Sequence, residues 1–239
     1  MEKAGEKTDA VRRARLNRQR VLSAAVALAD EAGIDAVSMR NLAQRLGVVP
    51  MALYKHVADK NELLDGMVDV IIGEIAPPGV EEDWKAEVRA RILSARQALL
   101  RHPWARAAIE SRTAAPTPAV LTYLNSMIGI FRVGGLSVDL THHVMHALGS
   151  RVWGFSQDLF EDSGGTPDPT EQAAMIRAMT EAYPYIAEII GAVTHDDASV
   201  VGGGCDDQVE FEFALDLLLD GVERLHERSQ ERGGGALRA

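Results

Sequence analysis

The histidines between residues 137 and 160 are the side chains whose type and spacing most suggest metal chemistry. His142 and His146 are four residues apart, so on a helix their imidazole rings could bind one metal ion. No carboxylate or cysteine stands at a matching spacing, and the alternative is that these histidines lie on a helix face or in a subunit interface. We therefore expect no bound metal and no cofactor.

Catalysis would require a nucleophile, an acid–base pair or a metal cluster in one cleft. No such set has a diagnostic spacing in the 239 residues, and the single cysteine, Cys205, excludes a disulfide framework. An enzyme is one alternative function, and a helical interaction module that does not bind DNA is another. We interpret the chain as a protein without enzymatic activity.

Charge is distributed unevenly along the chain. Residues 1–60 hold 11 Lys and Arg against 7 Asp and Glu, whereas residues 61–239 hold 14 against 28. A positive N-terminal part attracts phosphate and an acidic remainder is repelled by it, which favours a small DNA-binding head on a larger body. The alternative is a basic tail that only aids solubility. An arm near the phosphate backbone or minor groove, or else a solvated tail, would be formed by Arg12, Arg13, Arg15, Arg18 and Arg20.

Glycine, proline and capping residues predict an all-α fold, because no convincing run alternates apolar and polar residues as a strand would. Gly33 and Gly47 are expected to end helices in a left-handed conformation, and Pro77 and Pro78 must end the fourth helix. The expected helices cover residues 17–32, 38–46, 50–56, 59–76, 83–101, 104–112, 118–133, 137–160, a ninth from 168 that is kinked or interrupted at Pro184, and 207–228.

The segment from Met39 to Val57 has the spacing of a helix-turn-helix. Ala43 stands four residues before Gly47, so two short helices can approach closely around a tight turn. Leu42, Leu46, Val48 and Leu53 then form the apolar side, which leaves the second helix with a face for the major groove. Many unrelated helical hairpins share this spacing, so the spacing alone leaves both interpretations open.

The order of motifs over residues 16–75 resembles the DNA-binding domain of the TetR family. The resemblance rests on Arg18–Ala25, Ala27–Ile34, Ser38–Arg40, Leu53–Val57 and the pattern Asp59-Lys60 with Glu62-Leu63-Leu64. The rest of the chain looks like the tetracycline-repressor type of C-terminal domain, on Leu99-Leu100 with His102, Gly135-Leu136-Ser137 and the segment Phe211–Leu225. The resemblance implies a three-helix head and a larger helical body for ligand binding and dimerisation.

This resemblance assigns the recognition helix to residues 50–56. Arg40, Lys55 and Lys60 can contact phosphates or base edges, Tyr54 and His56 can donate to phosphates, and Met51 and Ala52 suit a thymine methyl group. Tyr54 has partial packing in the head as an alternative. Pro50 stands where the tetracycline repressor carries a glutamine, so the resemblance does not predict which operator sequence this chain binds.

The last helix carries two apolar rows, one through Phe211, Leu215, Leu218, Val222 and Leu225 and one through Phe213, Leu217 and Gly221. Such a wide stripe must be covered on more than one side, by its own domain and by a second subunit or entirely within a monomer. In the family that the chain resembles, the eighth and tenth helices pair across a two-fold axis, which favours a homodimer.

Met and aromatic side chains in the body suit an apolar or aromatic effector, with ordinary core packing as the alternative for each residue. The candidate ligand contacts are Trp104, Ile109, Met127, Phe131, His146 and Trp153. The resemblance places no histidine near Ala76 or Ile109, where the tetracycline repressor binds metal, so a magnesium–tetracycline complex is not the expected ligand.

The expected organisation has five parts: a flexible basic arm (1–15), the helix-turn-helix domain (16–60), a connecting helix (61–76), the C-terminal domain (77–228) and a disordered tail (229–239). No signal peptide or spanning segment is recognised, so we expect a cytoplasmic protein without a membrane partner. The sequence predicts a transcriptional regulator, by family analogy a repressor, whose partners are a palindromic double-stranded DNA operator, a small-molecule effector and a second copy of the chain.

Overall fold

The computed structural model describes residues 16–79, 83–111, 115–154, 182–183, 185 and 207–236. Within these ranges every regular element is a helix, as the sequence predicts. The chain divides into two compact units at residues 153 and 154, downstream of the boundary expected at Pro77 and Pro78. No described helix is both long enough and apolar enough to cross a membrane.

Helix α2 (Arg18–Ala32) begins the head. The Asn17 side chain accepts a hydrogen bond from the Arg20 amide at 2.8 Å and caps the helix. One apolar face of the helix is buried. Gly33 ends the helix with φ 80° and ψ 162°, so its φ is positive as expected but its conformation is not the left-handed helical one. The buried residues are Val21, Leu22, Ala25, Val26 and Ala29.

Helices α3 (Met39–Leu46) and α4 (Pro50–Leu53) form the expected helix-turn-helix. The Ser38 side chain caps α3, and Gly47 ends it with φ 68° and ψ 33°, the left-handed conformation that glycine adopts without strain. The Val48 amide donates to the Ala43 carbonyl at 3.0 Å and closes the turn. Leu42 and Leu53 are fully buried, which fixes α3 and α4 against the rest of the head.

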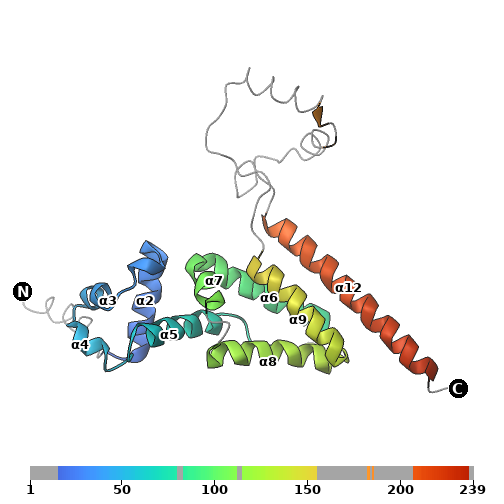
Figure 1. Cartoon of the computed structure of the whole chain (residues 1–239), viewed down its shortest axis with the longest axis horizontal. Helices are drawn as coiled ribbons and strands as arrows, with labels where there is room; N and C mark the ends of the chain where they lie inside the picture. Colours follow the sequence, from blue (N-terminus) through green and yellow to red (C-terminus); the bar gives the residue numbers. More distant parts are fainter. Residues whose placement is uncertain are drawn as a thin grey trace, which may run out of the picture. The chain divides into compact units, whose positions relative to one another are not determined.

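Helix α5 (Lys60–Gly73) connects the head to the helices that follow (Figure 1). The Asp59 side chain caps it by accepting from the Glu62 amide, and Glu62 in turn accepts from the Ala58 amide at 2.6 Å. The helix packs on α2 at one side and on the body helices at the other. A Cβ atom at Gly66 would lie 2.6 Å from Leu22, so this glycine permits the close approach of α5 to α2.

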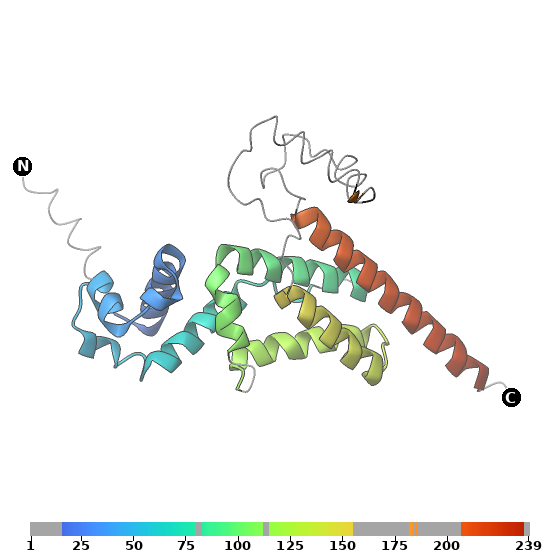
Figure 2. The same ribbon diagram turned by 45° about the horizontal axis from the view of Figure 1, so that its top comes forward.

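The body helices of the first unit are α6 (Trp84–Arg101), α7 (Pro103–Glu110), α8 (Pro118–Val133) and α9 (Val138–Gly154). Figures 1 and 2 show α6 and α8 beside α5, and these helices are in contact. The Trp84 and Phe131 rings meet at 5.8 Å between α6 and α8, and Phe131 has no exposed surface. Thr117 caps α8 as predicted, and Ser137, expected as the first residue of the next helix, caps α9.

Helix α12 (Asp207–Ala236) is the long helix of the second unit and continues past Arg228, into the segment predicted as a disordered tail. One row of its apolar side chains is buried and comprises Phe211, Leu215, Leu219 and Val222. Leu219 is buried in place of the expected Leu218, since the buried row advances by four, four and then three residues, and Leu225, expected at the end of this row, is 52% exposed. The basic arm, the ninth helix and the loop with Cys205 lie outside the described residues.

Candidate DNA-binding surface and ligand cavity

Helix α4 and the turn after it carry side chains that the sequence predicts for DNA contacts. Met51 is 71% and Tyr54 45% exposed, so Tyr54 does not belong to the core of the head, and Ala52 and His56 are half-buried. The helix is shorter than expected: it ends at Leu53, and Tyr54–His56 continue as a turn because the His56 and Val57 amides both donate to the Leu53 carbonyl. Leu53 anchors this segment while its outer face stays accessible.

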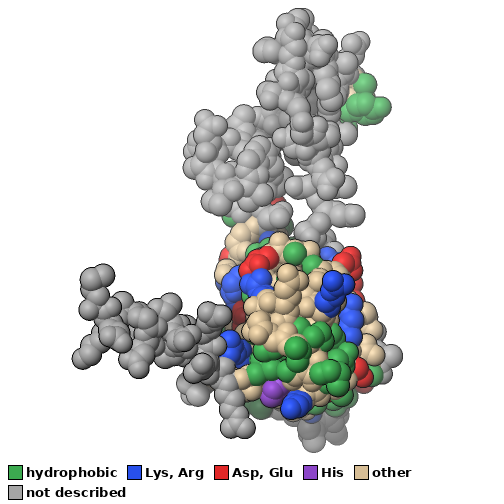
Figure 3. Space-filling view, turned by 90° about the vertical axis from the view of Figure 1, so that its left-hand side faces the viewer, with side chains coloured by type: hydrophobic (Ala, Val, Ile, Leu, Met, Phe, Trp, Pro, Cys, Tyr) green, Lys and Arg blue, Asp and Glu red, His purple; other side chains and the backbone are tan. Residues whose placement is uncertain are grey.

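Three cations surround α4. Arg40 stands in the first turn of α3, Lys55 follows α4 and Lys60 begins α5, and all three are exposed. Among the described residues none of the three has an ion-pair partner. Figure 3 faces this end of the head and shows hydrophobic side chains gathered next to a histidine, with Lys or Arg at the edge. This surface can offer cations to phosphates and apolar contacts to bases.

Arg45 differs from these cations because Glu31 neutralises it. Its guanidinium donates to the two carboxylate oxygens of Glu31 at 2.5 and 2.6 Å. These hydrogen bonds lower the pKa of Glu31 and raise that of Arg45. Arg45 therefore ties α3 to α2, whereas Arg40, Lys55 and Lys60, which have no ion-pair partner among the described residues, can bind a polyanion.

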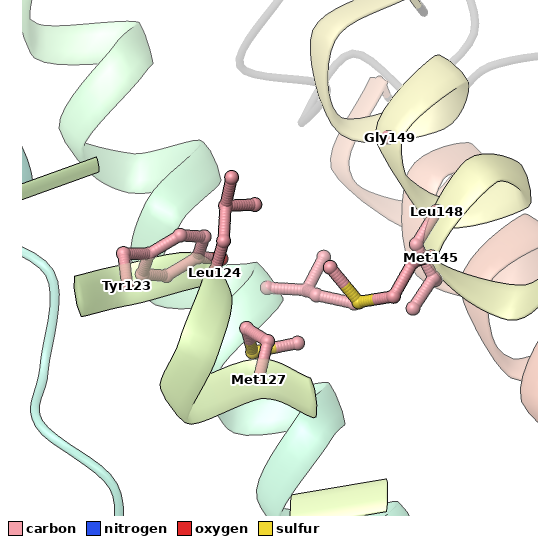
Figure 4. Close-up of a pocket in the computed structure, with 7 residues that line it drawn as sticks. Tyr123, Leu124, Met127, Met145, Leu148 and Gly149 are labelled. Atoms are coloured by element: carbon pink, nitrogen blue, oxygen red, sulfur yellow. The ribbon is translucent and has the colours of Figure 1, made fainter. Parts of the chain in front are cut away.

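A small cavity lies between α6, α8 and α9 of the body. Its volume is about 50 Å³, and Ile92, Tyr123, Leu124, Met127, Met145, Leu148 and Gly149 line it. Figure 4 shows the α8 side chains Tyr123, Leu124 and Met127 across from Met145 and Leu148 of α9. The space holds roughly one or two water molecules, so a drug-sized ligand requires that the helices or methionines move.

Tyr123 gives this apolar cavity one polar group. Its side chain is 9% exposed, and among the described residues its hydroxyl has no hydrogen-bond partner. Burial raises the pKa of Tyr123, and the nearby Arg91 charge opposes that shift, so the phenol is neutral and can donate. The Arg91 guanidinium lies 5.0 Å from the centre of the Tyr123 ring.

Arg91 itself is buried and joins three parts of the body. It donates to the Ala76 carbonyl at 3.0 Å and to the Ser126 hydroxyl at 2.8 Å, while its Nε has no partner. Burial lowers the pKa of Arg91. The guanidinium thus holds the segment after α5 and helix α8 in place beside the cavity.

The six ligand contacts expected from the sequence are scattered over the body. Met127 lines the cavity, whereas Phe131 packs on Trp84 and His146 is exposed. Trp104 donates its indole N–H to Asp30 in the head, Ile109 is buried in α7, and the side chain of Trp153 lies outside the described residues. Tyr123 and Met145 were missed; Tyr123 precedes Met127 by one helical turn, which was the available signal.

The histidine row of α9 is exposed at its surface. The rings of His142 and His146 lie 4.6 Å apart and are perpendicular. His142 also borders an open hollow of about 370 Å³ with Ile128, Arg132 and Val138. In the part of the chain that the structure describes, no group of three or more candidate ligands could hold a metal ion.

Comparison with known proteins agrees with this architecture. Residues 21–67 match the bacterial regulatory proteins of the tetR family, and residues 76–226 match the tetracyclin repressor-like, C-terminal domain. The tetracycline repressor protein class D of Escherichia coli is 41% identical over 92 residues, which are 37% of this chain and 42% of that protein. The chain thus matches less than half of the length of that relative.

Two further similarities extend over most of the chain. The HTH-type transcriptional repressor DrrR1 of Streptomyces coeruleorubidus is 27% identical over 226 residues, 92% of this chain and 82% of that protein. The crystal structure of the Streptomyces coelicolor TetR family protein ActR in complex with (S)-DNPA has a TM-score of 0.64 and 25% identity, and it covers 89% of this chain and 100% of that one. Because the two family matches together span the head and the body, the chain belongs to the TetR family of bacterial regulatory proteins.

Proposed function

We propose that this protein is a sequence-specific DNA-binding transcriptional regulator, a repressor that a small ligand releases from a palindromic operator. The observation that carries the proposal is the exposed face of α4 with the unpaired cations Arg40, Lys55 and Lys60 around it. The similarity to the repressor DrrR1 supports the direction of regulation. We propose no catalytic activity, and a protein that binds the chromosome acts in the cytoplasm.

A homodimer follows from the need to bind two half-sites. One head offers a single recognition element, and two copies related by a two-fold axis read a palindrome with half-site centres roughly 34–36 Å apart. Helix α12 supplies apolar surface for the second copy, since Phe213 is 65% and Leu217 60% exposed. A Cβ atom at Gly221 would meet no atom within 4 Å, so a partner helix can approach there.

The cavity around Tyr123 and Met127 is the proposed effector site. Its apolar walls suit an apolar or aromatic molecule, and the hydroxyl of Tyr123, which no described residue engages, favours one that carries a hydrogen-bond acceptor such as a carbonyl or carboxylate. ActR, a similar protein, binds the small molecule (S)-DNPA. Since the cavity is small, the ligand must widen the space between α8 and α9, and α8 contacts the connecting helix α5.

DNA binding is tested by selecting duplexes with the purified protein and measuring their affinity at several salt concentrations. Arg40→Ala and Lys60→Ala should each weaken binding and reduce the salt slope by about 1 per lost phosphate contact. Arg106→Ala is the matched control, because Arg106 lies on α7 in the body and pairs with Glu110. Equal affinity and equal slope for all three variants and the parent protein would remove Arg40 and Lys60 from the DNA surface.

The effector site is tested with a library of aromatic carbonyl and carboxylate compounds, screened for release of the selected duplex. Gly149→Leu should block the response to an active compound, because Gly149 lines the cavity and a larger side chain there would fill it. Gly129→Leu is the control: a Cβ atom there also meets no atom within 4 Å, but Gly129 does not line the cavity. A full response of the Gly149→Leu variant would place the effector elsewhere.

A further inference from the structure

A buried histidine joins the head to the body at the start of α7. His102 is 8% exposed and contacts carboxylates from two other helices. Its Nδ1 lies 2.8 Å from Oδ1 of Asp30, near the end of α2, and its Nε2 lies 3.3 Å from both carboxylate oxygens of Glu74, just after α5. In the sequence His102 is 72 positions from Asp30 and 28 positions from Glu74, so these contacts exist only in the folded protein.

The hydrogen-bond partners of His102 determine which ring nitrogen carries a hydrogen. Oδ1 of Asp30 also accepts the indole N–H of Trp104 at 2.6 Å. A carboxylate only accepts, so Nδ1 of His102 must carry a hydrogen in order to bond to Asp30. In the neutral ring Nε2 then has a lone pair directed at the Glu74 carboxylate, which is repulsive, whereas in the imidazolium Nε2 donates to it.

Other charges around the ring favour the same arrangement. Arg101, the last residue of α6, donates to Glu74 at 2.7 Å, and among the described residues Asp30, Glu74 and Arg101 are the charged groups of this joint. Partial burial raises the pKa of Glu74, hydrogen bonds and charges of Arg101 and His102 lower it, and the net direction is downward. Glu74 is therefore ionised at neutral pH. The Arg101 side chain is 52% exposed, so its ion pair contributes little to the joint.

We propose that His102 is a positioning residue for DNA binding: its charged form links Asp30 of α2 to Glu74 after α5 and holds the DNA-reading head at one angle on the body. Loss of the Nε2 proton breaks the link to Glu74 and leaves the link to Asp30. The head then samples more orientations relative to the body. DNA binding selects the one orientation that fits two half-sites, and the lost conformational entropy weakens the DNA affinity. DNA affinity thereby depends on pH through His102. This consequence rests on the proposed function, but the state of the imidazole does not.

The state of the imidazole is tested by nitrogen-15 NMR of the full-length protein with labelled histidine. Comparison with His102→Gln assigns the signals. In the neutral form the remaining hydrogen should be on Nδ1 and not on Nε2, because Nδ1 bonds to Asp30. Asp30→Ala should remove this preference. An Nε2–H tautomer in the parent protein would overturn the proposal without any bearing on DNA binding.

The positioning role is tested by measuring the dissociation constant for the selected duplex at pH 6.0 and 8.0 and constant salt. Affinity in the parent protein should fall by up to roughly tenfold over this range, the effect expected for one charged hydrogen bond. His102→Gln should remove most of that change. Glu74→Gln should retain affinity at pH 8.0, because a side-chain amide can donate to the bare Nε2 that a carboxylate repels.

His143→Gln is the control, since His143 is exposed on α9. It should keep the pH dependence of the parent protein. A merely structural role predicts that Glu74→Gln and His102→Gln weaken binding equally at both pH values. That result, or a parent-like pH dependence in His102→Gln, would overturn the positioning role.

Discussion

Gly134 lies where helix α8 ends against Trp84, and replacement by alanine should destabilise the body. A Cβ atom there would lie 2.6 Å from Cγ and 2.7 Å from Cβ and Cδ1 of Trp84. Carbon atoms in contact normally stay about 3.5–4.0 Å apart, so the methyl group is too close by about 1 Å. The near end of an indole cannot swing aside, and Trp84 also packs on the buried Phe131.

The cost of this overpacking should be about 1–3 kcal/mol in the free energy of unfolding. Gly129→Ala is the matched control, five residues earlier in α8. Its new Cβ atom would meet nothing within 4 Å. It should instead stabilise the protein by about 0.5–1 kcal/mol, because alanine loses less backbone entropy in a helix. The two variants carry the same chemical change with opposite predicted signs.

Urea unfolding followed by circular dichroism measures both free energies, with the protomer concentration held constant because dimerisation contributes to stability. In a separate thermal unfolding experiment, the midpoint temperatures of the two variants should differ by at least about 3 °C. Equal destabilisation by both alanines would show that backbone flexibility, and not contact with Trp84, governs these positions. Stabilisation by Gly134→Ala would refute the close packing at this helix end.

Substitutions at four further positions test the turn, the cap, the joint and the cavity. Gly47→Val should destabilise the head by about 1–3 kcal/mol and abolish DNA binding, whereas Gly47→Asn should fold, because asparagine tolerates a left-handed conformation and valine does not; thermal unfolding and DNA affinity measure both. Asp59→Ala should cost about 1 kcal/mol in urea unfolding through loss of the cap on the Glu62 amide. The lowered pKa of Glu74 means that the unfolded chain binds its proton more readily, so this stabilisation is complete above the ordinary value of 4.5 and is lost as the pH falls; Glu74→Gln should flatten the acid side of the stability profile. Tyr123→Phe should leave the urea midpoint nearly unchanged, because the hydroxyl has no partner to lose, yet weaken an effector that carries an acceptor, as titration calorimetry can measure.

Local signals along the chain were sufficient for most of the first unit. Asn17, Ser38, Asp59, Thr117 and Ser137 each cap the helix that begins at the next residue, and each stands within one residue of the helix start that the sequence predicts. A cap depends on a side chain and an amide two or three residues away, so adjacent sequence contains all the information. The same holds for the turn at Gly47, where both the positive φ and the buried partners follow from short spacings.

The sequence was less informative about which apolar side chains face which neighbour. Trp104 and Phe131 are of the aromatic type that often lines ligand pockets. In the structure Trp104 donates a hydrogen bond to Asp30, and Phe131 packs on Trp84. Periodicity identifies the buried face of a helix, and several different partners can cover the same face. The cavity therefore centres on Tyr123 and Met145, which the pattern of the sequence did not distinguish from ordinary core residues.

By itself the sequence predicted the all-α fold from spacings within a few helical turns, and its resemblance to the TetR family added the helix-turn-helix and the DNA-contacting residues of α4. Only the tertiary structure decided that His102 meets Asp30 and Glu74, and that the Tyr123 ring lies beside the Arg91 guanidinium. Those contacts join helices far apart in the chain, and their distances follow from the angles at which the helices cross. Crossing angles are set by the packing of whole surfaces, which no single spacing in the sequence encodes.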